Sequence, residues 1–222
     1  MKADDIVASF QTDNKGNDVG KAEYTNIINS GLAGQFEAKF EQTANGKYLV
    51  TLGATEGGGD LSKLSAEQKS FYDSFNDIAN DHSSIVAQDV VLNDDTVDWG
   101  SYASNKIDVG DMSKFNSISD KGHTGSTAQG LLAHETDEQH QFTKVEGYQS
   151  MNKIQKMNTW DTSHEHAIGV ENAVNGNERL KGRDINSGNS YTKFFKEANG
   201  SVTSETATSF TKNMQVTKMT IN

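Results

Sequence analysis

Apolar and polar residues alternate along the chain between positions 36 and 52, as they do in strands with one buried face. The alternating apolar residues lie on both sides of the dipeptide Asn45-Gly46: Phe36, Ala38, Phe40, Tyr48, Val50 and Leu52. Asn-Gly is a strong signal for a tight turn between antiparallel strands. The segment therefore predicts a β-hairpin.

A helix is predicted next, over residues 64–79. Its apolar face contains Phe71 and Phe75 at helical spacing. Its start is marked by Ser65 and, three residues later, by Gln68, which is the pattern of a capping box. Helix and hairpin together already indicate a mixed fold.

Strand patterns continue on both sides of the chain centre. The stretches "SSIVAQDVVLND" (83–94) and "NKIDVGDMSKF" (105–115) are rich in β-branched residues and predict a pair of strands. From residue 191 onward the chain alternates again and should return to β-structure. Residues 1–20 contain the polar turn cluster "DNKGNDVG" and are expected to be a loosely ordered lead-in.

A helix predicted over residues 126–146 has polar residues on the face that should enter the core. The residues of this stripe recur at offsets of 3, 7, 11 and 14 from the first: Leu131, His134, Glu138, Phe142 and Val145. Burying a histidine and a carboxylate without partners is costly. Such a stripe must therefore be paired, hydrogen-bonded or bound to a cation.

His134 and Glu138 are four residues apart, the spacing at which one helix supplies two ligands to a metal ion. Between them, Glu135 is placed to act as a general base, as the Glu does in His-Glu-x-x-His. Glu138 stands where that motif has its second His. A carboxylate is a harder ligand, so the expected ion is Zn²⁺ or another divalent metal.

The third ligand is expected from a second helix, over residues 163 to about 180. Its stripe again mixes apolar residues with potential ligands: His164, Ala167, Glu171 and Val174. Only one of the two ligands is expected to reach the ion, because they are about 10 Å apart along a helix. Glu171 is favoured since it has apolar neighbours, and His164 is the alternative.

Two segments resemble a known family. "GSTAQGLLAHETDEQ" and, after a spacer, "HAIGVENAVNGNERLKGR" are similar to zincin-like metallopeptidase domains of bacterial effectors and Rhs-repeat-associated toxins. The resemblance covers roughly residues 85–185, which would be the site-bearing core. It implies ligands at His134, Glu138 and Glu171, and a general base at Glu135. It also implies an exposed edge strand that receives a peptide, with 83–91 or 106–112 as candidates.

Composition narrows the function further. The net charge of −11, without a basic patch, disfavours nucleic acid as a partner. The absence of cysteine excludes thiolate metal sites and disulfides, so a metal must have N and O ligands. No signal-peptide core or apolar run of membrane-spanning length is present in the 222 residues, so we expect no membrane partner.

The sequence thus predicts a single α+β domain over residues 1–222. A small mixed or antiparallel sheet should pack on the ligand-bearing helix, with additional strands at the C-terminus. The expected function is metal-dependent hydrolysis of a peptide or protein substrate, in a protein secreted or delivered to a target cell. The alternative is a non-catalytic exported interaction module with a structural or decayed metal site. Oligomeric state is left undefined.

Overall fold

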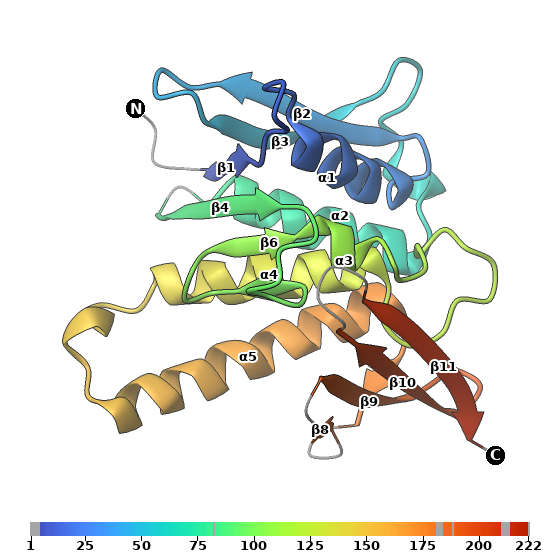
Figure 1. Cartoon of the computed structure of the whole chain (residues 1–222). Helices are drawn as coiled ribbons and strands as arrows, with labels where there is room; N and C mark the ends of the chain where they lie inside the picture. The colour runs from blue at the N-terminus through green and yellow to red at the C-terminus, as the bar shows by residue number, and fades with distance from the viewer. Residues whose placement is uncertain (1–4, 82, 181–183, 188, 210–213, 222) are drawn as a thin grey trace.

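The computed structural model describes residues 5–81, 83–180, 184–187, 189–209 and 214–221. It is a mixed α+β fold with two separate sheets and a group of helices between them (Figure 1). The α+β class predicted from the sequence is therefore confirmed. Among the described residues, no helix combines the length and the apolar character needed to span a bilayer.

The first sheet has six strands in the order β2-β3-β1-β4-β6-β5. Their bounds are β1 Asp5–Phe10, β2 Phe36–Gln42, β3 Tyr48–Ala54, β4 Ile85–Val91, β5 Gly100–Ser101 and β6 Lys106–Asp108. The central strands β1, β4 and β6 are parallel, whereas β3, β2 and β5 run antiparallel to their neighbours. The predicted pairing of 83–94 with 105–115 is confirmed as β4 and β6.

The expectation of a loosely ordered lead-in was wrong. Residues 5–10 form β1, which lies between β3 and β4 near the middle of the sheet. Ile6 and Ala8 are fully buried in its core-facing positions. The apolar run is short, and its partners lie about 40 and 80 residues further along the chain, so no local pattern identifies it.

The predicted hairpin is present as β2 and β3, which pair antiparallel from Phe36 opposite Ala54 to Gln42 opposite Tyr48. Gly46 has a φ of 79°, in the left-handed region that favours glycine, so the turn has the residue that its backbone requires. The amide of Gly46 donates to the carbonyl of Thr43, 3.0 Å away. Local sequence is therefore sufficient to specify this element.

Helices cover one face of the first sheet. This is seen in β4, where the buried side chains of Val86, Gln88 and Val90 alternate with more exposed ones. The helices are α1 Val19–Ser30, α2 Ala66–Ala79, the short α3 Val109–Met112, α4 Ala128–Thr143 and α5 Lys153–Asn175. Two 3-10 turns are also present: Leu61–Lys63 precedes α2, and Tyr148–Ser150 lies between α4 and α5. The predicted capping box of α2 is present at Ser65 and Gln68.

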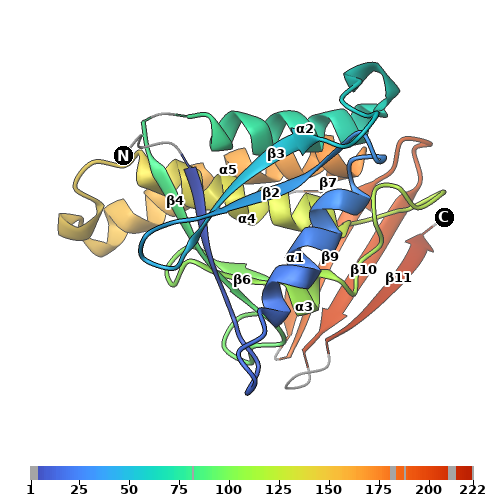
Figure 2. The same ribbon diagram turned by 90° about the horizontal axis from the view of Figure 1, so that it is seen from above.

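The second sheet contains the C-terminal part of the chain, as predicted, and lies beside the helices (Figure 2). Its order is β11-β10-β9-β7, and β8 pairs with β9. The strands are β7 Glu178–Arg179, β8 Ile185–Ser187, β9 Ser190–Lys196, β10 Val202–Thr208 and β11 Gln215–Ile221. All of the pairings in this sheet are antiparallel.

The second ligand-bearing helix differs from its predicted bounds. It begins at Lys153, ten residues before the expected start, and ends at Asn175, so the helix does not continue to residue 180. Gly176, with a φ of 68°, terminates it in the left-handed conformation typical of a helix end. Arg179 consequently belongs to β7 and enters the second sheet.

Residues from the second sheet hold the N-terminal end of α4. The amide of Ser126 donates to Glu205 Oε2 at 2.8 Å, and Lys218 Nζ donates to the carbonyl of Ser126, also at 2.8 Å. Asn175, at the end of α5, accepts hydrogen bonds from the amide and hydroxyl of Thr127, the N-cap of α4. These contacts fix α4 relative to α5 and to β10.

Candidate metal centre

Helix α4 is buried on all sides, from Ala128 to His140, rather than along one stripe. Its polar side chains have buried partners: Gln88 donates to Thr136 Oγ1 at 3.0 Å, and Gln129 donates to the carbonyl of Ile27 at 2.7 Å. A helix that enters the core with so many polar groups needs such partners. Buried polar groups on α4 that lack a hydrogen-bond partner are therefore candidates for binding a ligand.

Three predicted ligand residues converge where α4 crosses α5. One potential ligand atom each from His134, Glu138 and His164 lies within 4.8 Å of the others. His134 Nε2 is 3.3 Å from His164 Nδ1, and His164 Nδ1 is 3.4 Å from Glu138 Oε1. In a tetrahedral zinc site with bonds of about 2.0–2.1 Å, ligand atoms are about 3.3–3.4 Å apart. Two of the three separations therefore match such a site, and all three lie within 4.8 Å, so the three residues are candidate ligands of one divalent ion.

Two buried carboxylate oxygens at this point have no hydrogen-bond donor among the described residues. They are Glu138 Oε1 and Glu135 Oε2, on side chains that are each 4% exposed. Leaving such atoms without a partner is costly in a folded protein. A cation and a water molecule held by it would satisfy both oxygens.

Glu171 lies behind His134, on the opposite side of the imidazole from this group. Its Oε2 is 3.0 Å from His134 Nδ1. Burial lowers the pKa of His134, and Glu171 opposes that effect only partly. A neutral imidazole with Nδ1 directed at a carboxylate presents its Nε2 lone pair to a metal.

Glu171 is itself held by two cations. Lys193 Nζ is 3.3 Å from Oε1, and Arg179 Nη1 is 3.4 Å from Oε2. Burial alone would raise the pKa of Glu171, but Lys193, His134 and Arg179 together hold it well below its ordinary value. Glu171 is therefore a buried anion whose charge is already compensated.

The sequence favoured Glu171 over His164 as the third ligand, and the structure arranges them the other way. His164 is grouped with His134 and Glu138, whereas both oxygens of Glu171 face other partners. His164 and Glu171 lie two turns apart on one stripe of α5, so periodicity could not separate them. The crossing point of the two helices decides which of the two residues lies beside both His134 Nε2 and Glu138. Trp160 stacks on the ring of His164, with centroids 4.8 Å apart.

Glu135 lines a cavity together with His134 and His164. Burial raises its pKa to about 8, and the charge of Glu138 adds to this effect. On the sheet side, Glu135 packs against Gly100 of β5, where a Cβ atom would collide with its carboxylate. A side chain at position 100 would therefore force the Glu135 carboxylate to move.

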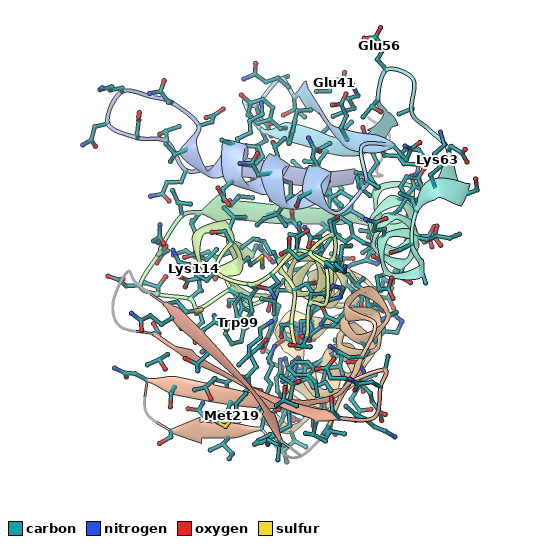
Figure 3. All side chains as sticks on the ribbon, turned by 90° about the vertical axis from the view of Figure 1, so that its right-hand side faces the viewer. Glu41, Glu56, Lys63, Trp99, Lys114 and Met219 are labelled. Carbon is teal, nitrogen blue, oxygen red and sulfur yellow. The ribbon has the colours of Figure 1, made fainter. Side chains whose placement is uncertain are left out.

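The cavity has a volume of about 480 Å³ and lies between the two sheets. Trp99, at the entry to β5, forms part of its wall and is labelled in Figure 3. His134, Glu135 and His164 line it together with residues of the second sheet and of the loop before β5: Asp95, Asp98, Arg179, Asn186, Asn189, Ser190, Tyr191, Lys193, Ala207, Ser209 and Met214. Its size is typical of small-molecule and peptide pockets.

Sequence reasoning missed Arg179 and Lys193. Arg179 was read as part of a helix, but it is buried in β7, where its guanidinium donates to Asp184 at 2.7 Å and to Tyr191 Oη at 2.6 Å. Lys193 occupies an inward-facing position of β9, two residues from the fully buried Phe195. A lysine in the apolar register of a strand was the available signal.

The remaining α4 and α5 histidines, His140 and His166, face other partners. His140 Nε2 is 2.7 Å from Asp81 Oδ2, and His166 Nδ1 is 2.6 Å from Asp137 Oδ2.

The expected edge strand was wrong: β4 is internal and β6 is covered by β5. The strand at this edge of the sheet is β5, next to Glu135.

Comparison of the chain with protein-family models, with curated proteins and with solved structures found no match. The functional argument therefore depends on the arrangement of the side chains.

Proposed function

We propose that His134, Glu138 and His164 bind one divalent metal ion, with zinc the best fit, and that the site hydrolyses peptide bonds. The observation that carries this proposal is the convergence of three ligand atoms within 4.8 Å of one another beside a cavity. Glu135, with an unpartnered buried oxygen, lines that same cavity. The resemblance of the two helices to zincin-like domains supports the same reaction class.

The ion would supply Lewis acidity at the cavity wall. In the proposed reaction, Glu135 accepts a proton from water as the water oxygen forms a bond to the peptide carbonyl carbon. The carbon–nitrogen bond then breaks, and Glu135 returns the proton to the departing amine. Glu171 holds the ring of His134, and Lys193 with Arg179 keeps Glu171 ionised. An extended peptide would add to the outer edge of β5.

The metal proposal is tested by elemental analysis of protein purified without chelator and then incubated with zinc. We expect close to one ion per chain and its loss in His134→Ala. His164→Ala should also lose the ion, whereas the control His166→Ala, two residues along the same helix, should retain it. Zinc-free wild-type protein would overturn the proposed site.

The choice between His164 and Glu171 is tested by comparing zinc affinity. Because Glu171 acts through His134, Glu171→Gln should weaken binding by roughly 10- to 100-fold, as mutations of residues that orient a ligand do. His164→Ala removes a ligand and should weaken binding further. The opposite order would return the role of third ligand to Glu171.

Hydrolysis is tested with Glu135→Gln, which should keep the metal and the fold while losing about 10²- to 10⁴-fold in rate. The assay is a mixed peptide library read by mass spectrometry for new termini. The exposed Glu41, on β2, provides the control Glu41→Gln. If zinc-loaded wild-type protein yields no termini that Glu135→Gln lacks, hydrolysis is wrong and a non-catalytic binding module replaces it.

A further inference from the structure

Two carboxylates at the mouth of the cavity have no compensating charge among the described residues. Asp95 and Asp98, in the loop before β5, are exposed, line the cavity, and form no ion pair or hydrogen bond within the described part of the chain. Their neighbour Asp94 differs, because Lys106 Nζ lies 2.7 Å from its Oδ2. Of the three aspartates in this loop, Asp94 is paired with a lysine, whereas Asp95 and Asp98 at the cavity have no ion-pair partner among the described residues.

The cations of the cavity wall cannot neutralise these carboxylates, because both are already paired. Lys193 is 3.3 Å from Glu171, and Arg179 contacts Glu171 at 3.4 Å and Asp184 at 2.7 Å. The two buried cations are thus matched by two anions. Asp95 and Asp98 add to the cavity wall two negative charges that no described residue pairs with.

A second observation indicates that the cavity is built for a ligand. Glu135 is 4% exposed, its Oε2 has no hydrogen-bond partner within the described residues, and Gly100 leaves it the space to lie there. Its wall also offers amide and hydroxyl groups, from Asn189 and Ser209. Such a wall suits a polar peptide backbone, and the charge at the mouth suits a cation.

We propose that the cavity selects peptides with a lysine or arginine side chain, whose cationic end contacts Asp95 and Asp98 while the neighbouring backbone lies beside Glu135. This inference rests on the proposed function and names its substrate class. A metal ion is a poorer occupant of the mouth. Among the described residues, the group of three ligands close enough to share an ion is His134, Glu138 and His164, which includes neither aspartate.

The test measures the binding of three fluorescein-labelled pentapeptides, identical except for a central Arg, Gln or Glu, by fluorescence anisotropy. The zinc-loaded Glu135→Gln variant is used so that no peptide is consumed, and wild-type protein is measured beside it. Two partly exposed ion pairs should make the Arg peptide bind roughly 3- to 30-fold more tightly than the Gln peptide. The Glu peptide should bind most weakly.

The double substitution Asp95→Asn/Asp98→Asn should reduce binding of the Arg peptide to the level of the Gln peptide. The control Glu56→Gln/Asp77→Asn changes the net charge equally at two exposed positions outside the cavity, so it should keep the preference. Added salt should weaken the Arg peptide selectively. Equal affinity for the three peptides, no binding of any peptide, or an unchanged preference in Asp95→Asn/Asp98→Asn would overturn the inference.

Hydrolysis is read separately, from new termini in a peptide library. Termini that cluster beside basic residues in wild-type protein, and lose that clustering in Asp95→Asn/Asp98→Asn, would support both proposals. An Arg preference in binding without any new termini would overturn hydrolysis and leave recognition of basic peptides intact. New termini without a preference for basic residues would support hydrolysis and overturn the recognition of basic peptides.

Discussion

Replacing Lys193 with methionine should destabilise the protein, although this lysine is far in sequence from the metal-ligand candidates. Lys193 is 4% exposed, and its Nζ lies 3.3 Å from Glu171 Oε1 and 4.8 Å from the centre of the Trp99 ring. Burial lowers the pKa of Lys193, and Glu171 opposes that effect. The substitution removes a positive charge and leaves a fully buried carboxylate with less compensation.

The expected magnitude follows from this geometry. Breaking a buried ion pair by removing one partner costs about 3–5 kcal/mol. Glu171 still has Arg179 at 3.4 Å and His134 at 3.0 Å, so we expect the lower end, about 3 kcal/mol. For a chain of this length, a loss of about 3 kcal/mol lowers the melting temperature by roughly 6–12 °C.

The assay is thermal unfolding followed by circular dichroism in the presence of EDTA, so that metal binding does not contribute to stability. Lys196→Met, at the exposed end of the same strand, is the control and should change the melting temperature by no more than about 2 °C. Adding Glu171→Gln to Lys193→Met should recover part of the loss, because the unmatched charge is gone. A drop below about 2 °C for Lys193→Met, or strictly additive effects, would refute the charge-pairing argument.

Two further predictions concern backbone space and pH. Gly100→Ala should displace the Glu135 carboxylate and lower hydrolysis by at least about 10-fold. Gly169→Ala, in the open middle of α5, should keep hydrolysis and raise the unfolding free energy by about 0.5–1 kcal/mol; equal hydrolysis by the two variants would contradict this. Burial, with the charge of Asp108, raises the pKa of Asp111 from 3.8 to about 7, so the folded state favours the protonated form. The contribution of Asp111 to stability should therefore be lost as pH rises from 3.8 to about 7, and Asp111→Asn should remove that contribution in urea unfolding; a pH profile identical to that of the wild type would contradict it.

The elements that the sequence predicts well are those specified by neighbouring residues. The hairpin depends on Asn45-Gly46, and the start of α2 depends on Ser65 and Gln68. β1 could not be recognised, because it is defined by partners in β3 and β4 rather than by its own short run. The early start of α5 had a local signal, a capping box formed by Asn152 and Gln155, which was overlooked.

The candidate site was predictable in its residue types but not in its geometry. His134, Glu138 and His164 were identified by helical spacing, and the structure brings them together. Periodicity places His164 and Glu171 on the same face, so the choice between them depends on how α4 crosses α5. That crossing is set by contacts far along the chain.

Contacts of this kind decide whether the site can be moved to another protein as a continuous segment. The stretch 85–185 contains each of the three ligand candidates and Glu135, yet a fragment cut at its end would lack Lys193, Glu205 and Lys218. Glu171 would lose one of its cations, and the first turn of α4 would lose its anchors in the second sheet. We therefore expect that α4 and α5 alone, moved into another protein, would not form the site. A search for related sites in other proteins should use a spatial template that includes the lysine from a distant strand, because a linear motif would accept many helices that cannot support this charge arrangement.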